Sequence, residues 1–218
     1  MATKKKIGII GSGDVGVALA NGFVAHGYDV LAGTNTPAKR DDLKARTGGR
    51  AHIGSFADAA MFGDIVVLAT KGTATEIALQ AAGIDHLDGK TVIDTTNPIA
   101  DAPPVNGILR FFTPADDSLM ERLQRAAPRA NFVKAFSCLG NALMVDPALA
   151  GGPPTMFICG NNEGAKAEVS AILVEFGFEV EDVGAVEGAR AIEPLCILWC
   201  ARGFRGGGWT HAFKLLKS

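Results

Sequence analysis

A glycine-rich turn near the start of the chain constrains the fold more than any other feature. The turn reads Gly11-Ser12-Gly13-Asp14-Val15-Gly16 and follows a short apolar stretch, residues 6–10, that is typical of a buried strand. After the turn, an apolar-faced helix is expected to run to about His26, with Gly27 in the usual C-cap position. A strand, a glycine turn and a helix in this order form the first half of a dinucleotide-binding βαβ unit.

Each glycine of the turn has its own physical role in such a unit. Gly11 permits the tight turn, Gly13 leaves space for a pyrophosphate beside the backbone, and Gly16 lets the helix pack close to the strand. The N-terminus of the helix offers free N–H groups and the positive end of its dipole to the phosphates. A GxGxxG string alone is a weak signal, and the alternative is a plain structural turn. Because this string lies between a strand and a helix, it predicts a dinucleotide site.

The second predicted strand, residues 29–33, indicates which dinucleotide suits the site. Enzymes that use NAD usually carry Asp or Glu at the end of this strand, where it binds the ribose hydroxyls. Here no carboxylate stands at the strand end, and the following residues supply hydroxyl, amide and cationic groups: Thr34, Asn35, Lys39 and Arg40. Such groups suit the charge of a 2′-phosphate, so we predict NADP(H) rather than NAD(H). The alternative is that the two cations form only the solvated first turn of a helix.

The composition argues against several other classes of protein. The chain has 218 residues, of which 48% are hydrophobic, and its 21 basic and 23 acidic side chains give a formal net charge of −2. It shows no basic patch for nucleic acid, no apolar run that could span a membrane, and no export signal. The four cysteines lack CxxC spacing and are expected to be reduced, and no set of metal ligands is visible. We therefore expect a cytoplasmic protein that binds no nucleic acid, membrane or metal.

Predicted strands and helices alternate along the chain, which favours an α/β fold with a doubly wound parallel sheet of the Rossmann type. After the first two strands, further strands are expected at 51–54, 64–69, 90–94 and 131–135, with helices at 56–62, 73–82 and 120–127. Residues 100–118, rich in Pro and Asp, form the longest irregular stretch. We interpret residues 1–150 as an NADP-binding Rossmann domain.

A Gly-Gly-Pro-Pro segment then leads into a smaller α/β subdomain, residues 151–218. Its expected elements are strands at 155–159 and 179–183, helices at 165–176 and 187–202, a flexible segment at 203–208 and a final short helix at 209–217. We expect this subdomain to close over the nucleotide. Because Trp199, Trp209 and Phe213 add apolar surface to its long helix, we also expect it to form a homodimer.

Further candidate binding residues follow the predicted strands, at the edge where Rossmann folds bind their ligands. Ala69, Thr70 and Lys71 follow one strand; Lys71 either touches a phosphate or the substrate, or is a solvated loop lysine. The backbone of Asn97-Pro98 is expected to line the nicotinamide, with an ordinary turn as the alternative. Four residues are expected to line a substrate: Phe136, Ser137, Cys138 and Leu139. The thiol among them has no activating partner nearby in the sequence, which favours a packing role for it.

Together these motifs resemble the NADPH-dependent reductases of the deazaflavin coenzyme F-420, a group that includes the oxidoreductase domain of the mammalian six-transmembrane metalloreductases. The resemblance spans nearly the whole chain. Besides the glycine turn, it is carried by Thr95-Thr96-Asn97-Pro98, Val133-Lys134-Ala135-Phe136, Cys138-Leu139-Gly140-Asn141 and Trp209-Thr210-His211-Ala212-Phe213-Lys214. Family members often carry a hydrophobic-Pro pair where this chain has Lys71.

The resemblance implies hydride transfer between NADP(H) and a flavin-like or deazaflavin coenzyme, without a catalytic side chain, and dimers built from the C-terminal region. In such a reaction the protein holds two rings face to face while the cofactors carry the chemistry. Two other functions stay open. One is a dehydrogenase of the hydroxyacid or 6-phosphogluconate type, although 218 residues leave little room for the helical substrate domain of those enzymes. The other is an NADP(H)-binding redox sensor without catalysis.

Overall fold

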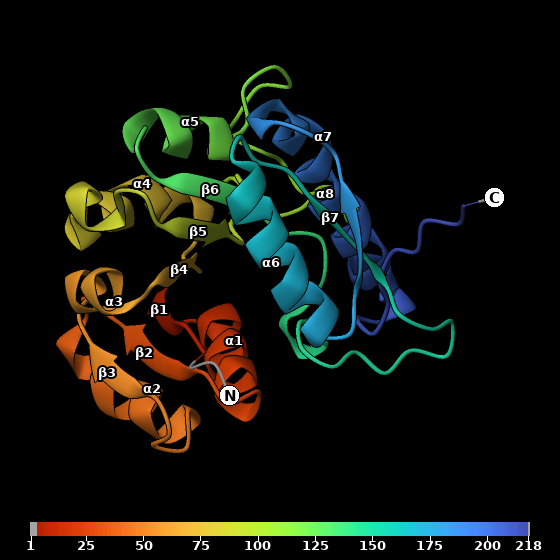
Figure 1. The fold of residues 1–218 in the computed structure, drawn as a ribbon. Helices are drawn as coiled ribbons and strands as arrows, with labels where there is room; N and C mark the ends of the chain where they lie inside the picture. Colours follow the sequence, from red (N-terminus) through yellow and green to blue (C-terminus); the bar gives the residue numbers. More distant parts are fainter. Residues whose placement is uncertain (1–3, 218) are drawn as a thin grey trace.

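The computed structural model describes residues 4–217, and six parallel strands form its main sheet (Figure 1). The strands lie in the order β3-β2-β1-β4-β5-β6. Their bounds are β1 Lys6–Ile10, β2 Asp29–Gly33, β3 His52–Gly54, β4 Ile65–Leu68, β5 Thr91–Asp94 and β6 Asn131–Lys134. This order is that of a doubly wound Rossmann sheet, which confirms the predicted fold class.

Helices link successive strands and cover both faces of this sheet. They are α1 (Asp14–Ala25), α2 (Arg40–Arg46), α3 (Phe56–Phe62), α4 (Gly72–Ala82) and α5 (Leu119–Ala126). Because successive strand residues point to opposite faces, Ile65 and Val67 pack with α1, whereas Val66 and Leu68 pack with α3, α4 and α5. Within residues 4–217, no helix has both the length and the apolar character that crossing a membrane requires.

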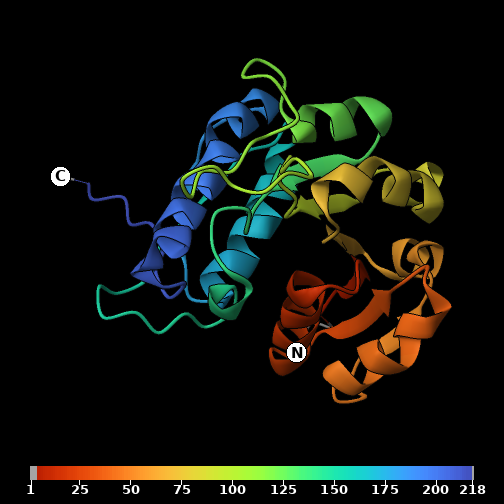
Figure 2. The same ribbon diagram turned by 180° about the vertical axis from the view of Figure 1, so that it is seen from behind.

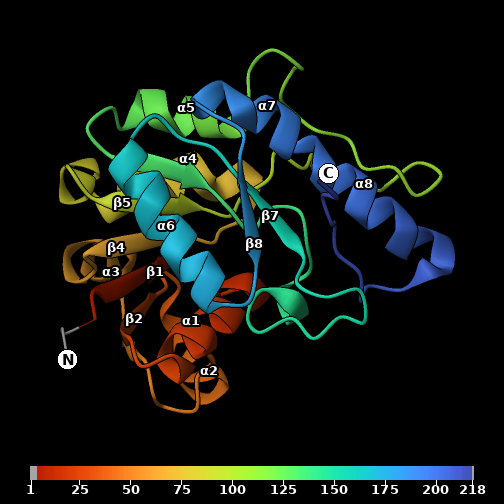
Figure 3. The ribbon, with the colours of Figure 1, turned by 45° about the vertical axis from the view of Figure 1, so that its right-hand side comes forward.

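A second sheet of two parallel strands forms the small C-terminal α/β part. It consists of β7 (Thr155–Ile158) and β8 (Glu179–Asp182), which are joined by α6 (Glu163–Glu175). Figures 1 and 3 show α6 lying across the face of the main sheet that also carries α1. The N–H of Lys134 in β6 donates to the carbonyl of Cys159 at 3.0 Å, so the small sheet is joined directly to the large one.

The helix predicted at 187–202 is interrupted in the structure. The chain forms a 3-10 turn (Val186–Gly188), α7 (Ala189–Ile192) and α8 (Pro194–Arg202), with a break at Glu193. Pro194 has no N–H group and cannot continue the hydrogen-bond ladder of the preceding turn, which explains the break. The predicted helix is therefore present but divided at Glu193, whose own backbone dihedral angles stay helical.

The final helix predicted at 209–217 is also absent from the structure. A wide helical turn (Gly203–Gly207) follows α8, and the chain then runs extended beside β7. The N–H of Thr155 donates to the carbonyl of Phe213 at 2.9 Å, and the N–H of Leu215 donates to Thr155 Oγ1 at 3.0 Å. These contacts with a distant strand satisfy the backbone in place of a helix.

The long irregular segment between β5 and α5 runs back toward the C-terminal helices. Seen from behind in Figure 2, this yellow-green segment passes along α8. A Cβ built on Gly107 would lie 3.4 Å from the Cβ of Phe204, so the tip of the segment packs against the end of α8. The segment and α8 therefore lie together beside the carboxyl edge of the main sheet.

Candidate functional site

The loops that follow β1, β4 and β5 meet at the carboxyl edge of the main sheet. The strand order reverses between β1 and β4, and α/β folds bind ligands at such a reversal. A cavity of about 380 Å³ opens there, lined by Gly13, Asp14, Val15, Ala69, Thr70, Lys71, Gly72, Thr95, Thr96, Asn97 and Ile99. The structure thus brings together residues of three motifs that are far apart in the sequence.

The three glycines of the turn have the geometry that a dinucleotide site requires. Gly11 has a φ of +140°, and a Cβ there would lie 2.2 Å from the carbonyl oxygen of Ala69. A Cβ on Gly16 would lie 2.3 Å from the carbonyl oxygen of Gly11, so α1 packs tightly on the turn. Among residues 4–217, a Cβ on Gly13 would meet nothing within 4 Å, and no side chain caps the N-terminus of α1. Open space and free N–H groups therefore lie where a pyrophosphate would bind.

The loop after β2 is braced by its polar side chains and leaves two cations free. The buried Thr34 Oγ1 accepts hydrogen bonds from Ser12 Oγ and from the N–H of Thr36, both at 3.2 Å. Asn35 Oδ1 accepts from the N–H of Phe56 at 2.9 Å. The following cations, Lys39 and Arg40, are exposed, and neither forms an ion pair with any residue in the range 4–217. Lys39 ends a 3-10 turn (Pro37–Lys39) and Arg40 begins α2, so both cations stand in exposed helical turns, and the choice between a 2′-phosphate contact and a solvated helix start stays open.

Lys71 combines features of both interpretations that the sequence left open. It lines the cavity, yet its side chain is exposed and forms an ion pair with Asp101 from the loop after β5. The two loops also touch through Gly72, where a Cβ would lie 1.9 Å from the carbonyl oxygen of Asn97. Lys71 therefore helps to join the walls of the cavity.

Asn97 and Ser137 leave two buried polar atoms without a partner among the described residues. Asn97 Nδ2 donates to the carbonyl oxygen of Ser137 at 2.7 Å, while Asn97 Oδ1 and Ser137 Oγ have no hydrogen bond. A buried polar atom without a partner destabilises a fold unless another molecule satisfies it. Of the two residues, Asn97 lines the cavity, and a carboxamide carries the N–H donors that its Oδ1 lacks, so this wall of the cavity fits the carboxamide of a nicotinamide.

The remaining residues that were expected to line a substrate lie in the hydrophobic core. Phe136 is 1% exposed, and its ring packs against Phe176 and Phe178, with centroids at 6.3 and 6.0 Å. Cys138 and Leu139 belong to the same cluster, and burial raises the pKa of the Cys138 thiol to about 12. The ring of Phe136 therefore packs in the core, which corrects the expectation that it faces a substrate. The buried thiol of Cys138 has the packing role that the sequence favours for it.

Three charged residues that the sequence did not mark as functional are buried next to the cavity. Asp94 ends β5, Lys134 ends β6, and the sheet register pairs these two residues directly. Lys134 Nζ lies 2.6 Å from Asp94 Oδ2 and 2.9 Å from Oε1 of Glu193. Burial alone would lower the pKa of Lys134, but the two carboxylates raise it above its ordinary value. The signal in the sequence was a pair of opposite charges at the ends of two apolar strands.

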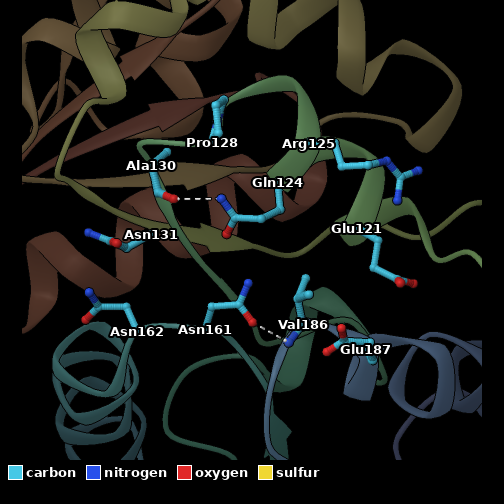
Figure 4. Close-up of a pocket in the computed structure, with 10 residues that line it drawn as sticks. All are labelled: Glu121, Gln124, Arg125, Pro128, Ala130, Asn131, Asn161, Asn162, Val186 and Glu187. Atoms are coloured by element: carbon cyan, nitrogen blue, oxygen red, sulfur yellow. Dashed lines mark hydrogen bonds between the residues drawn. The ribbon is translucent and has the colours of Figure 1, made fainter.

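A second hollow, of about 540 Å³, lies between α5, the start of β6 and the loops after β7 and β8 (Figure 4). Its amide side chains are bound to the local backbone. Gln124 Nε2 donates to the carbonyl of Ala130 at 2.9 Å, and Asn161 Oδ1 accepts from the N–H of Val186 at 2.9 Å. None of the residues selected from the sequence lines this hollow. The cavity at the β1/β4 edge is therefore the better candidate site.

Known proteins resemble this chain in sequence and in fold. Residues 6–98 match a family model described as NADP oxidoreductase, coenzyme F420-dependent. A structure from Arthrobacter sp. FB24, provisionally assigned as an F420-dependent NADP-reductase, is 32% identical with a TM-score of 0.92. That match covers 98% of this chain and 100% of the other.

Two more distant proteins extend the comparison. The metalloreductase STEAP3 from Rattus norvegicus is 27% identical over 191 residues, which is 87% of this chain but only 36% of STEAP3. A reductive aminase from Aspergillus terreus, solved with NADPH and ethyl levulinate, is 20% identical with a TM-score of 0.65. The match covers 94% of this chain and 63% of the aminase chain, and at this identity it shows the fold alone. The match to the Arthrobacter protein, in contrast, joins 32% identity to nearly complete coverage of both chains. The chain therefore belongs to the coenzyme F420-dependent NADP oxidoreductases, a family that binds NADP(H).

Proposed function

We propose that this protein transfers a hydride between NADP(H) and a flat flavin-like or deazaflavin coenzyme. The cavity at the carboxyl edge of the sheet carries the proposal. It joins the open backbone at Gly13, the free N-terminus of α1 and the loop of Asn97 in one continuous surface. Membership of the family supports the coenzyme and the class of reaction. The hydride acceptor and the residues that bind it are the new part of the proposal.

NADP(H) would lie along this edge in an extended form. Lys39 and Arg40 would bind the 2′-phosphate, and the turn Gly11–Gly16 would bind the pyrophosphate through backbone N–H groups. The nicotinamide would lie against Ala69-Thr70 and the loop around Asn97-Pro98. Asn97 Oδ1, which has no partner within residues 4–217, would accept a hydrogen bond from the carboxamide.

The residues around the cavity supply binding and orientation rather than acid–base chemistry. Bound NADPH supplies the hydride, so the protein has only to align the two rings and exclude water. Cys138 is a neutral thiol at neutral pH because burial raises its pKa to about 12. Lys71 is exposed and paired with Asp101. Neither side chain is suited to proton transfer at the reacting carbon.

Oxidation of NADPH in the presence of different acceptors tests the proposal. Deazaflavin coenzyme, FMN, FAD and a quinone should be compared under identical conditions. Turnover with a three-ring acceptor, and little with the quinone, is the expected result. Tight binding of NADPH without turnover of any acceptor would contradict hydride transfer and favour a redox sensor.

The domain division and the assembly belong to the same proposal. We assign coenzyme binding to residues 1–150 and a covering role to residues 151–218, which carry α6, α7 and α8. The covering part would place α8 over the hydride acceptor. A second copy of the chain would bind to this C-terminal part.

A further inference from the structure

The buried charges of Asp94, Lys134 and Glu193 form a network that is larger than a simple ion pair. The side chains of Asp94 and Lys134 are 0% exposed, and that of Glu193 is 2% exposed. The Glu193 carboxylate also accepts hydrogen bonds from the N–H groups of Leu119 and Met120, at 3.1 and 3.0 Å. The network thus joins the ends of β5 and β6 to the N-terminus of α5 and to the start of α8.

The network binds all three polar groups of Thr96, a residue that lines the cavity. Asp94 Oδ1 accepts from the N–H of Thr96 at 2.9 Å and from its hydroxyl at 2.7 Å. Lys134 Nζ donates to the carbonyl oxygen of Thr96 at 2.9 Å. Thr96 lies between Thr95 and Asn97, and all three line the cavity. The position of this loop therefore depends on a lysine that does not itself line the cavity.

Burying a lysine and two carboxylates costs desolvation free energy, which their mutual attraction offsets only in part. Well-packed apolar residues of similar volume are often as stable as a buried ion pair, so the network adds little stability of its own. The network instead fixes an arrangement: the ammonium group of Lys134 holds the carbonyl of Thr96 and the carboxylates of Asp94 and Glu193 in one geometry. That property is useful beside a site whose ligand must be aligned for reaction.

We propose that Lys134 is a positioning residue for the nicotinamide half of the coenzyme. It fixes the carbonyl of Thr96 and thereby holds the loop 95–97 where Asn97 can reach the carboxamide. This inference rests on the proposed function, because it assumes that NADP(H) occupies the cavity. The adenosine half of the coenzyme would bind elsewhere, to the glycine turn after β1 and to the residues that follow β2. Among residues 4–217, no hydrogen bond or ion pair of Lys134 reaches the glycine turn or the loop 34–40.

The two halves of the coenzyme therefore provide the test. Binding of NADP⁺ and of adenosine 2′,5′-bisphosphate, which lacks the nicotinamide, should be measured by calorimetry for the unaltered protein and for Lys134→Met. We expect the Kd of NADP⁺ to rise about tenfold in the variant, while the Kd of the bisphosphate changes by less than about twofold. The ratio of the Kd of NADP⁺ to the Kd of the bisphosphate is informative, because a general loss of structure would weaken the binding of both ligands and leave the ratio unchanged.

Lys166→Met is the matched control. Lys166 is also a buried lysine with two carboxylates, since its Nζ lies 2.7 Å from Asp182 and 2.8 Å from Glu163, but it belongs to α6. Its replacement should leave the ratio unchanged even if the protein loses stability. If Lys134→Met does not fold, Asp94→Asn removes one charge at nearly constant shape and should raise the ratio in the same direction.

The outcomes separate the two proposals. If the folded Lys134 variant binds both ligands more weakly by the same factor, or binds both as well as the unaltered protein does, the positioning role is overturned. The proposed function stands in either case. An unaltered protein that binds neither ligand would overturn the proposed function and the positioning role with it.

Discussion

Arg40 is the residue that we expect to decide between NADPH and NADH. It is the first residue of α2, exposed and without an ion pair within residues 4–217, and it follows a loop that lacks the strand-end carboxylate of NAD enzymes. Arg40→Glu places a negative charge beside the 2′-phosphate, so the Kd of NADPH should rise at least about tenfold. The Kd of NADH, which lacks this phosphate, should change little. Calorimetry with both coenzymes measures the difference.

An exposed arginine outside the site provides the control for this charge reversal. Arg50 precedes β3 and therefore lies toward the amino edge of the sheet, so Arg50→Glu should leave both affinities unchanged. Equal affinity of the unaltered protein for NADPH and NADH would contradict the assignment of the loop to a 2′-phosphate.

Gly13 tests the phosphate site itself. A Cβ at this position meets no atom of the described residues within 4 Å and the backbone is extended, so Gly13→Val should fold normally. Its branched side chain would occupy the space that the pyrophosphate needs, and NADPH binding should be lost. Gly151→Val is the matched control, because a Cβ there also meets nothing within 4 Å. Normal NADPH binding by the Gly13 variant, measured by calorimetry, would place the phosphate site elsewhere.

At the scale of residues, the sequence predicts the role of a residue when that role depends only on its neighbours along the chain. The glycine turn has a fixed order of roles along six residues, so the tight turn at Gly11 and the close packing at Gly16 could be predicted. The network of Asp94, Lys134 and Glu193 could not, because it depends on the register of β5 and β6 and on a residue far along the chain. Phe136 was misjudged for a related reason: its place after a strand suggested a substrate face, whereas its ring points into the core.

At the scale of elements, two buried carboxylates hold the N-terminus of α5, those of Glu193 and Glu121. Glu121 accepts from the N–H of Ser118 at 2.8 Å in a capping box, and Arg190 of α7 binds the same carboxylate. The hydrogen bonds from Arg190, with those from Ser118, lower the pKa of Glu121 to about 2 although burial opposes the change. Glu121→Gln should therefore lower the free energy of unfolding by about 1–2 kcal/mol at pH 7.

The pH dependence of this loss has a defined sign. Because the pKa of Glu121 in the folded protein lies below its ordinary value of 4.5, its charge stabilises the fold fully above that pH. The difference in stability between the unaltered protein and Glu121→Gln should shrink as the pH falls from about 4.5 toward about 2. Urea unfolding at several pH values measures it, with the exposed Glu187→Gln as a neutral control. A constant difference across this range would exclude the ionised carboxylate as its source.

Elements with a clear period were predictable, and those fixed by distant contacts were not. The alternating strands and helices of the main sheet follow from apolar periodicity and from turn residues. The segment 209–217 contains apolar residues at helical spacing, but its backbone is bound to Thr155 in β7. The break before α8 was visible in the sequence as Pro194, which has no N–H group to continue a helix.

At the scale of the whole molecule, exposed apolar side chains gather on α8 and on the turn that follows it, in the C-terminal part. Leu198, Phe204 and Trp209 are 60%, 46% and 44% exposed, and the ring of Phe204 meets that of Trp209 edge to face at 5.2 Å. The segment that carries Ile108, which is 47% exposed, packs beside them. Trp199, in contrast, is buried and stacks on His211, so it belongs to the core. Exposed apolar surface of this kind marks interfaces.

We predict that this surface closes a homodimer with two-fold symmetry, the commonest arrangement for a surface that binds its own copy. Light scattering at micromolar concentration should give twice the chain mass of 22.6 kDa. Phe204→Glu introduces a charge into the buried interface and should give a folded monomer, because Phe204 contributes little to the core of its own chain. Ile77→Glu is the matched control: Ile77 is 74% exposed on α4, away from this surface, and its replacement should leave the dimer intact. A mass of 22.6 kDa for the unaltered protein would exclude the dimer, and the surface would then be free to bind the hydride acceptor directly.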